Sequence, residues 1–411
     1  MKPMKFWLIA MTLAAVVSDT MLLPFYPQFF ERVFGITDPN YVGAYIAACC
    51  AVVMLAFPFW ARVSRHIPVL KLLVYTQLAA GLFSVLCWAA PTVTAFWLLS
   101  LTMLVFKGSY LLVYPLLMSQ EAPDDHGRTI GLLSVVVHFG AIFGAVLGGS
   151  VLQFFEPRQV YLLMTFGDLF QILVCLCLLR DQRGAATESK NEGAAAEENN
   201  ERESEKEGAV GLPWPVIMRL GSAMFLFYFA VYLSRPFFAR YWEMLSGNPG
   251  EVVAGAIFAI PGAVAVAVLW LDHRRGRDGD AKGMLLPALG FCSLGLMLQA
   301  SGEMAVVLAG RVLYGWGLFR ATVGLDQLLY ALSRPASYAA DFSKISVFQN
   351  LGVLASSFAT GALVAFAGPQ PTFLAGALGI ALTLVLYLAL VRPLFASSNS
   401  SLPAAISRSE A

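Results

Sequence analysis

Twelve runs of mostly apolar residues, each about long enough to cross the hydrocarbon core of a bilayer, follow one another along the chain. They lie near residues 6–30, 41–60, 69–90, 94–118, 130–154, 159–179, 215–238, 251–271, 283–300, 304–332, 343–367 and 371–391. Hydrophobic residues make up 58% of the 411 residues and charged residues only 13%, against roughly 25% charged residues in soluble domains. The sequence therefore predicts an all-α membrane protein with 12 transmembrane helices.

A hydrophilic stretch separates the first six apolar runs from the last six. Residues 180–214 hold nine acidic side chains against five basic ones. Such a segment cannot bury enough apolar surface to offset the entropy lost on ordering. We therefore expect a disordered acidic linker at 181–214 between an N-terminal bundle at 1–180 and a C-terminal bundle at 215–392, with a tail at 393–411.

The basic residues predict the orientation in the membrane. The two most charged internal loops, 61–71 and 272–282, each follow the second span of their half. When both termini and the linker are placed on the side of these loops, 19 Lys and Arg residues face that side. Four lie on or near the other side: Arg32, Arg158, Arg235 and Arg240. Because positively charged loops remain in the cytoplasm, the N- and C-termini are expected to be cytoplasmic.

Two segments recur at the same spacing, which indicates an internal duplication. Pro24 begins a proline–aromatic segment that recurs 212 residues later from Pro236. Gly140, in the fifth span, is matched at the same spacing by Gly352. Repeated halves in membrane proteins usually build a transporter with its site at their interface. We expect two pseudo-symmetric six-helix bundles around a central site.

Ionisable side chains inside the spans are candidates for function, because a charge at mid-bilayer costs about 2.5–3.5 kcal/mol even on insertion scales. Asp19 shares a helix face with Tyr26, and Lys107 shares a stripe with Tyr110 and Tyr114. If the first and fourth spans line one cavity, Asp19 and Lys107 can oppose each other. Two hypotheses stay open: a fixed ion pair, or an Asp19 carboxylate that takes up and releases a proton as its surroundings change.

Three arginines and a second acid also lie in or near spans. Arg311 and Arg320 are nine residues apart, on opposite faces of the tenth span, so they cannot both face one cavity. Arg320 is expected to pack against a neighbour or, with Asp326, to reach toward the cytoplasmic end. Arg235, near the expected outer end of the seventh span, either guards the outer mouth or lies at the membrane interface. Asp168 is expected to have a structural partner that the sequence does not identify.

His138 and Asn350 occupy equivalent positions in the repeat. A histidine on a membrane helix is either a hydrogen-bonded packing residue or a proton relay, since it titrates near neutral pH. Both residues are candidates for the central site.

Glycines every four residues mark the fifth span, at Gly140, Gly144, Gly148 and Gly149. Small residues at this spacing let two helices approach closely. The run resembles the glycine helix of proton-coupled exporters of the major facilitator superfamily, although Ala145 stands where those exporters usually have proline. The resemblance implies a gating role in addition to helix packing.

Other segments carry the same resemblance. Arg311, Gly315 and Gly317 in GRVLYGWG look like the RxxxGxG motif of the superfamily, which favours Arg311 over Arg320 as the functional arginine. Asp19 in SDTMLLPFYP resembles the first-span acid of drug and amine exporters. The likeness covers nearly all of the chain apart from the linker, and it implies the superfamily fold and alternating access.

The resemblance implies a proton-coupled exporter of a small amphipathic organic molecule in a bacterial cytoplasmic (inner) membrane. SDTMLLPFYP and SRPFFARYWE look most like segments of siderophore exporters of this superfamily. Two alternatives stay open: a multidrug/proton antiporter in which Asp19 binds cationic drugs, and a proton-linked uptake permease for a sugar or an organic acid.

Other classes of protein find little support. The chain has no Walker, HExxH or GxSxG motif, so we expect neither an enzyme nor a cofactor. Its six cysteines lie in apolar runs and are expected to be free thiols rather than metal ligands. The net charge of +1 suggests no nucleic-acid partner. The expected partners are a small-molecule substrate, protons and the lipid bilayer, and the protein is expected to be a monomer. A transporter-derived receptor with the linker as its signalling arm is a further alternative.

Overall fold

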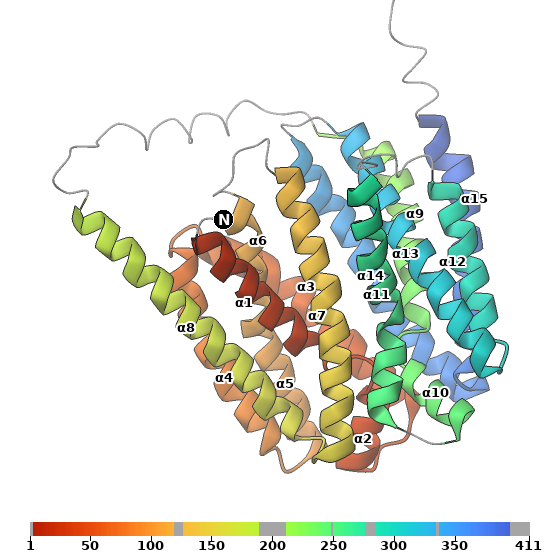
Figure 1. Cartoon of the computed structure of the whole chain (residues 1–411), viewed down its shortest axis with the longest axis horizontal. Coiled ribbons are helices and arrows are strands. Elements are labelled where there is room, and N and C mark those ends of the chain that lie inside the picture. Colours follow the sequence, from red (N-terminus) through yellow and green to blue (C-terminus); the bar gives the residue numbers. More distant parts are fainter. Residues whose placement is uncertain are drawn as a thin grey trace, which may run out of the picture.

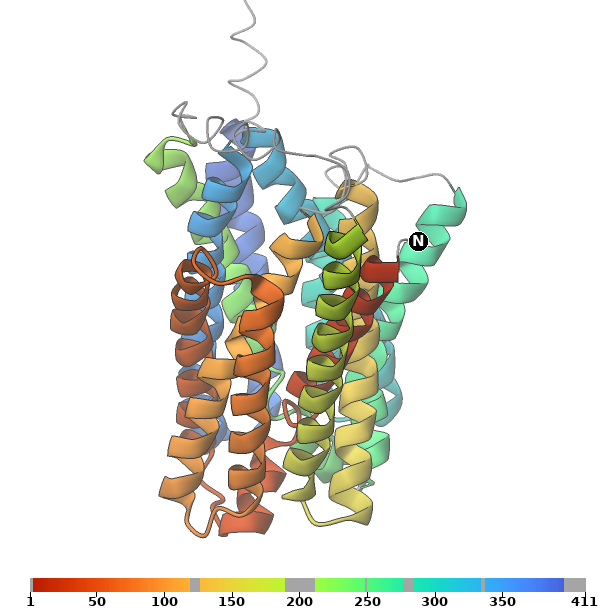
Figure 2. The same cartoon turned by 90° about the vertical axis from the view of Figure 1, so that its left-hand side faces the viewer.

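The computed structural model describes residues 3–118, 126–188, 211–247, 250–275, 284–333 and 337–394. The regular secondary structure in these ranges is helical. The helices form two halves that lie side by side, coloured red to yellow and green to blue (Figure 1). A view turned by 90° shows long helices running between the same two ends of the molecule (Figure 2).

The first half holds the first six expected spans, some of them divided into shorter helices. These are α1 (Pro3–Thr20), α2 (Tyr26–Phe34), α3 (Pro39–Val63), α4 (Val69–Trp88), α5 (Val93–Lys107), the 3-10 helix η1 (Gly108–Leu112), α6 (Val113–Met118), α7 (His126–Phe154) and α8 (Gln159–Glu188).

The second half repeats this order of spans. Its helices are α9 (Trp214–Leu233), α10 (Phe238–Ser246), α11 (Glu251–Arg275), α12 (Leu285–Gln299), α13 (Met304–Leu332), α14 (Tyr338–Ala367), α15 (Gln370–Leu386) and the π-helix η5 (Tyr387–Val391).

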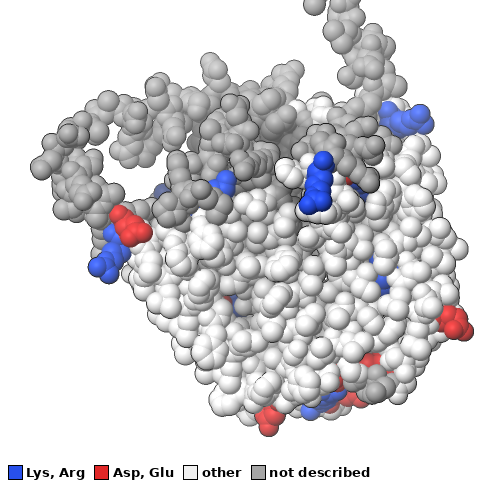
Figure 3. Space-filling view, in the orientation of Figure 1, with Lys and Arg blue, Asp and Glu red and all other residues white. Residues whose placement is uncertain are grey.

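Each apolar run corresponds to one helix or to consecutive helices, which confirms the predicted fold of twelve spans in two halves. Within the described ranges, ten segments are long and apolar enough to cross a membrane, and α12 is a shorter apolar helix. The first span is divided between α1 and α2. On the face shown in Figure 3, charged side chains gather at the two ends and leave a largely uncharged band between them.

The first and seventh spans break at the same point of the repeat. Proline lacks an N–H and its ring collides with the preceding turn, so Pro24 and Pro236 interrupt the two spans. The short helices that follow, α2 and α10, both end at a glycine with positive φ: 69° at Gly35 and 65° at Gly247. Glycine adopts this left-handed conformation without strain. The predicted 212-residue repeat is therefore visible in the backbone.

Two helix pairs join the halves: α7 packs on α11, and α3 packs on α14. The repeat exchanges these pairs, because α3 is equivalent to α11 and α7 to α14. At Gly43 on α3, an added Cβ atom would lie 2.6 Å from the carbonyl oxygen of Ser357 and 2.9 Å from Cα of Gly361 on α14. Small residues thus let the halves approach closely.

The structure describes only part of the segment between the halves. Helix α8 continues to Glu188, into the segment expected to be a disordered linker. The described residues resume at Gly211, and the Leu212 N–H donates to the buried Asp341 carboxylate at 3.0 Å. The rest of the expected linker, at 189–210, lies outside the described residues, as does the expected tail beyond 394.

Candidate functional site

Asp19, near the end of α1, lies on a helix face that points into the first half. It lies on the same helix face as Leu8, Thr12 and Ala15, which are all buried. Asp19 itself keeps an exposed surface on this otherwise buried face. The Tyr110 hydroxyl is hydrogen-bonded to this carboxylate.

Lys107 forms its ion pair with Asp168 and not with Asp19. Its Nζ atom lies 3.0 Å from Oδ1 of Asp168, and both side chains are buried. The Ser84 hydroxyl lies 3.4 Å from Oδ2 of Asp168, to which it donates. Asp19 interacts electrostatically with Lys107 and with Asp168. The partner of Asp168, which the sequence could not identify, is therefore Lys107. Asp19 lies near this ion pair without joining it.

Two further tyrosines from the sequence analysis lie close to this cluster. Tyr26, at the start of α2, and Tyr114, on α6, are both half-buried and interact electrostatically with Asp19. The Tyr26 ring contacts Tyr45 on α3 edge to face, with centroids 5.3 Å apart. The break between α1 and α2 thus brings Tyr26 to the same interior as Asp19.

Arg311 is buried within the second half, where it binds backbone carbonyl groups. Its Nε donates to the Ile257 carbonyl at 3.2 Å, and Nη2 donates to the Phe258 carbonyl. Nη1 lies 3.4 Å from Oε1 of Gln299, and the guanidinium lies over the Phe238 ring at 4.0 Å. The expected cavity arginine therefore ties α13 to α10, α11 and α12.

Arg320 pairs with Asp272 on a neighbouring helix at 2.7 Å, which agrees with the first of the two alternatives that the sequence left open. This ion pair joins α13 to the end of α11. Asp326 is hydrogen-bonded to Gln349 instead. Helical periodicity placed Arg320 on the correct side of its helix but could not identify which neighbour lies there.

Arg235 lies at the break between α9 and α10, and not at the outer end of its span as expected. The difference arises because α10 adds nine helical residues beyond the break. The guanidinium lies over the Tyr232 ring at 4.3 Å, and it is hydrogen-bonded to Tyr314. Arg235 is half-buried.

The equivalent positions His138 and Asn350 differ in their surroundings. His138, on α7, contacts the Phe319 ring on α13 edge to face, with centroids 6.0 Å apart, so it lies where the two halves meet. Asn350 is exposed, and its Nδ2 donates to the Ser346 carbonyl of its own helix at 2.8 Å.

The glycine run on α7 lies against α1 and the start of α11. An added Cβ atom at Gly140 would lie 2.9 Å from Val16, and one at Gly144 would collide with Thr20 and with the Val17 carbonyl on α1. At Gly148 the collision would be with the Met21 backbone just beyond α1. At Gly149 the collision would be with the Glu251 carbonyl of α11. This run thus sets how closely α7 packs within its own half and against the other half.

The glycines of the tenth span also lie at helix contacts. An added Cβ atom at Gly315 would lie 2.6 Å from Cα of Pro261 on α11. At Gly317 it would lie 2.5 Å from the Cys292 nitrogen on α12. All six cysteines are free thiols, and no metal-binding group of three His, Cys, Asp or Glu occurs within the described ranges.

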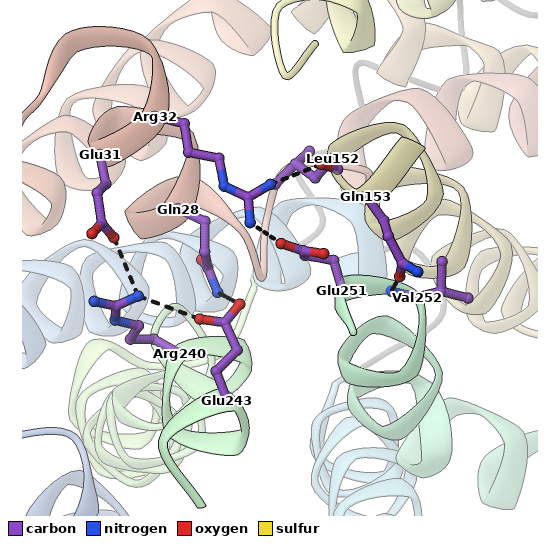
Figure 4. A network of polar contacts seen from close by, with 9 residues as sticks. All are labelled: Gln28, Glu31, Arg32, Leu152, Gln153, Arg240, Glu243, Glu251 and Val252. Atoms are coloured by element: carbon purple, nitrogen blue, oxygen red, sulfur yellow. Dashed lines mark hydrogen bonds and ion pairs between the residues drawn. The ribbon is translucent and has the colours of Figure 1, made fainter. Parts of the chain in front are cut away.

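A second cluster of polar side chains joins the halves at the end of the molecule opposite the N-terminus (Figures 1 and 4). There, Gln28 on α2 donates to the Glu243 carboxylate on α10 at 2.9 Å. Arg240 on α10 pairs with Glu31 on α2 at 3.2 Å. In the repeat, position 28 is equivalent to 240 and position 31 to 243. The two contacts are therefore pseudo-symmetric copies of each other. The Gln28–Glu243 contact joins a neutral amide to a carboxylate, and the Arg240–Glu31 contact is an ion pair.

Three further contacts flank this pair on one side. Arg32 donates to the Leu152 carbonyl at 2.8 Å and pairs with the buried Glu251 at the start of α11. The Val252 N–H donates to Oε1 of Gln153 at 3.0 Å. We call these nine residues the inter-half network: Gln28, Glu31, Arg32, Leu152, Gln153, Arg240, Glu243, Glu251 and Val252 (Figure 4). These contacts were not predicted from the sequence, although an acid after two aromatic residues recurs in both halves, at Glu31 and Glu243, and is the signal for them.

Two pseudo-symmetric six-helix halves, with broken helices and ionisable side chains in their interior, define a multi-pass membrane transporter. A family model described as the Major Facilitator Superfamily matches residues 8–278. The chain belongs to this superfamily.

Two bacterial relatives are similar over much of the chain. The multi-drug resistance efflux pump PmrA of Streptococcus pneumoniae is 23% identical over 374 residues, which cover 89% of this chain and 90% of the relative. The multidrug resistance protein MdtG of Escherichia coli is 23% identical over 285 residues, which cover 67% of this chain and 66% of the relative.

Solved transporter structures share the fold. The POT family transporter PepTSo superposes with a TM-score of 0.72 at 9% identity, covering 96% of this chain and 99% of that one. The human organic anion transporter MFSD10 has a TM-score of 0.67 at 15% identity, covering 94% of this chain and 100% of that one. At these identities the likeness shows the fold alone.

Proposed function

We propose that the protein is a secondary active exporter that exchanges a small amphipathic organic molecule for protons by alternating access. Membership of the superfamily and the efflux pumps among the relatives support transport in the outward direction. The observation that carries the proton coupling is that Lys107 is paired with Asp168, while Asp19 interacts electrostatically with this pair but forms no ion pair of its own with Lys107.

The charge balance of this cluster suggests how a proton takes part. With a proton on Asp19, Lys107 and Asp168 form a neutral pair. With Asp19 ionised, the cluster carries one net negative charge, and an uncompensated charge in a dry interior costs several kcal/mol. Ionised Asp19 is therefore favoured when water or a cationic group reaches it, and protonated Asp19 is favoured when the interior closes. Substrate and proton thus bind alternately.

The inter-half network supports a direction for the opening. We place this network at the periplasmic side of a bacterial cytoplasmic membrane, because the basic loops favour a cytoplasmic location for the opposite end. In this arrangement the periplasmic end is closed and Asp19 is reached from the cytoplasm. Both termini and the linker are then cytoplasmic, and export requires the network to open.

The names of the relatives favour a multidrug substrate range over a single substrate. Siderophore export depends on the SDTMLLPFYP and SRPFFARYWE segments alone. Uptake of a sugar or an organic acid would require the same cluster to work in the reverse direction.

Everted membrane vesicles with an imposed proton gradient test the proposal, with ethidium as the probe. We expect the wild type to accumulate ethidium, Asp19→Asn to lose accumulation while remaining in the membrane, and the exposed control Asp181→Asn to behave as the wild type. Full accumulation by Asp19→Asn would remove Asp19 from the coupling mechanism. Replacing ethidium with 2,3-dihydroxybenzoate tests the siderophore hypothesis.

A further inference from the structure

Arg235 lies at the point where the seventh span loses its helical hydrogen bonds. Tyr228 and Tyr232 precede it at helical spacing, and all three side chains are half-buried. Broken helices in transporters present polar groups to a binding site at mid-membrane. Arg235 and its two tyrosines therefore occupy the place in the second half where a substrate group would bind.

The tyrosine side of α9 is distinct from its lipid side. An apolar groove on the surface is lined by Leu226, Phe229 and Leu233 of α9, together with residues of α14 and α15. Successive residues of an α-helix are about 100° apart, so Tyr228 and Tyr232 lie roughly 100° around α9 from this groove. Their partial exposure is therefore on a different side of the helix from the apolar groove.

The guanidinium of Arg235 also differs in its partners from the other buried cations. Lys107 and Arg320 are paired with acids, and Arg311 binds backbone carbonyls. Arg235 has the Tyr232 ring beneath it and the hydroxyl of the buried Tyr314 beside it, and this hydroxyl donates to the Val231 carbonyl at 3.5 Å. Among the described residues, no carboxylate lies within ion-pair distance of it. A guanidinium has five N–H donors, so donors remain for an anion.

We propose that Arg235, Tyr228 and Tyr232 form an anion-binding subsite for aromatic substrates that carry a carboxylate or a similar anionic group. The anion binds the guanidinium, while the ring of the substrate packs against Tyr232 and Tyr228. Charge-assisted hydrogen bonds of this kind are about twice as strong as neutral ones. This subsite rests on the proposed export function. It would bind the anionic group of the substrate in the second half, while Asp19 exchanges the proton in the first half.

Equilibrium binding to the purified full-length protein in detergent tests this subsite without a proton gradient. The probes are 2-naphthoate and its neutral analogue 2-naphthamide, measured by isothermal titration calorimetry. We expect the wild type to prefer the anion. We expect Arg235→Gln to weaken the binding of 2-naphthoate about tenfold or more and to change the affinity for 2-naphthamide less than about twofold. Arg235→Lys, which keeps the charge, retains part of the preference.

The matched control is Arg219→Gln, which removes an exposed arginine from the same helix. It is expected to bind both probes as the wild type does. An unchanged preference in Arg235→Gln would overturn the subsite, as would a wild type that binds neither probe or does not distinguish them. If the preference depends on Arg235 but vesicles transport no probe, the export proposal fails and the subsite stands. If vesicles transport ethidium but Arg235 has no effect on binding, the subsite alone fails.

Discussion

The inter-half network predicts which ion pair contributes most to holding the two halves together at the end of the molecule opposite the N-terminus. Arg32 and Glu251 pair with 40% and 4% of their side chains exposed, whereas Arg240 and Glu31 are 43% and 39% exposed. An exposed ion pair contributes about 0–1 kcal/mol. A hydrogen bond to a charged group contributes about 1.5–3 kcal/mol, against about 1 kcal/mol for a neutral one. The buried acid is therefore expected to dominate.

Neutralising each acid separately tests this ranking. Glu251→Gln is expected to lower the stability of the closed state relative to the open state by about 1–2 kcal/mol. Because 1.4 kcal/mol corresponds to a factor of ten, the closed-to-open equilibrium shifts about tenfold. Glu31→Gln shifts it less than about fivefold. Hydrogen exchange followed by mass spectrometry on peptides covering α2 and α10 reports the opening as faster exchange.

The control for this experiment is Glu303→Gln, an exposed acid in the loop between α12 and α13. Its exchange rates are expected to match the wild type. Equal acceleration in Glu31→Gln and Glu251→Gln would refute the argument from burial. No acceleration in either variant would show that apolar packing, and not the network, keeps this end closed.

Two further predictions concern stability, measured as the melting temperature of the purified protein. Gly148→Ala introduces a Cβ atom against the Met21 backbone and should destabilise the protein by about 1–3 kcal/mol. The control Gly290→Ala, with open space around it, should have little effect on the melting temperature. Equal losses of stability in the two variants would count against close packing of α7 on α1. Lys107→Met leaves Asp168 buried and unpaired and should lower the stability of the protein by about 3–5 kcal/mol. Adding Asp168→Leu should restore most of this stability. A double variant no more stable than Lys107→Met would contradict the ion-pair argument.

The sequence predicted the spans and the repeat because both depend on local patterns. A bilayer-length apolar run has few alternatives to a membrane helix, and Pro24 and Pro236 mark equivalent breaks through their own backbone chemistry. Gly140 and its neighbours on α7 lie at helix contacts because close approach depends on the absence of a side chain.

The pairing of charges could not be predicted in the same way. Periodicity gives the face of a helix on which Lys107 lies, but not that Asp168 lies across from it. Arg311 matched a motif, yet its guanidinium binds backbone carbonyls of α11 that no side-chain pattern reveals. Arg235 was placed at the wrong depth because the continuation of its span into α10 was not recognised.

Proton release on substrate binding tests the central claim most directly. In weakly buffered detergent solution with a pH-sensitive dye, adding tetraphenylphosphonium to the purified wild type should release about one proton per cation bound, because cation and proton compete for one carboxylate. Asp19→Asn should release none. Equal proton release by Asp19→Asn, or cation binding by the wild type without any release, would contradict the account.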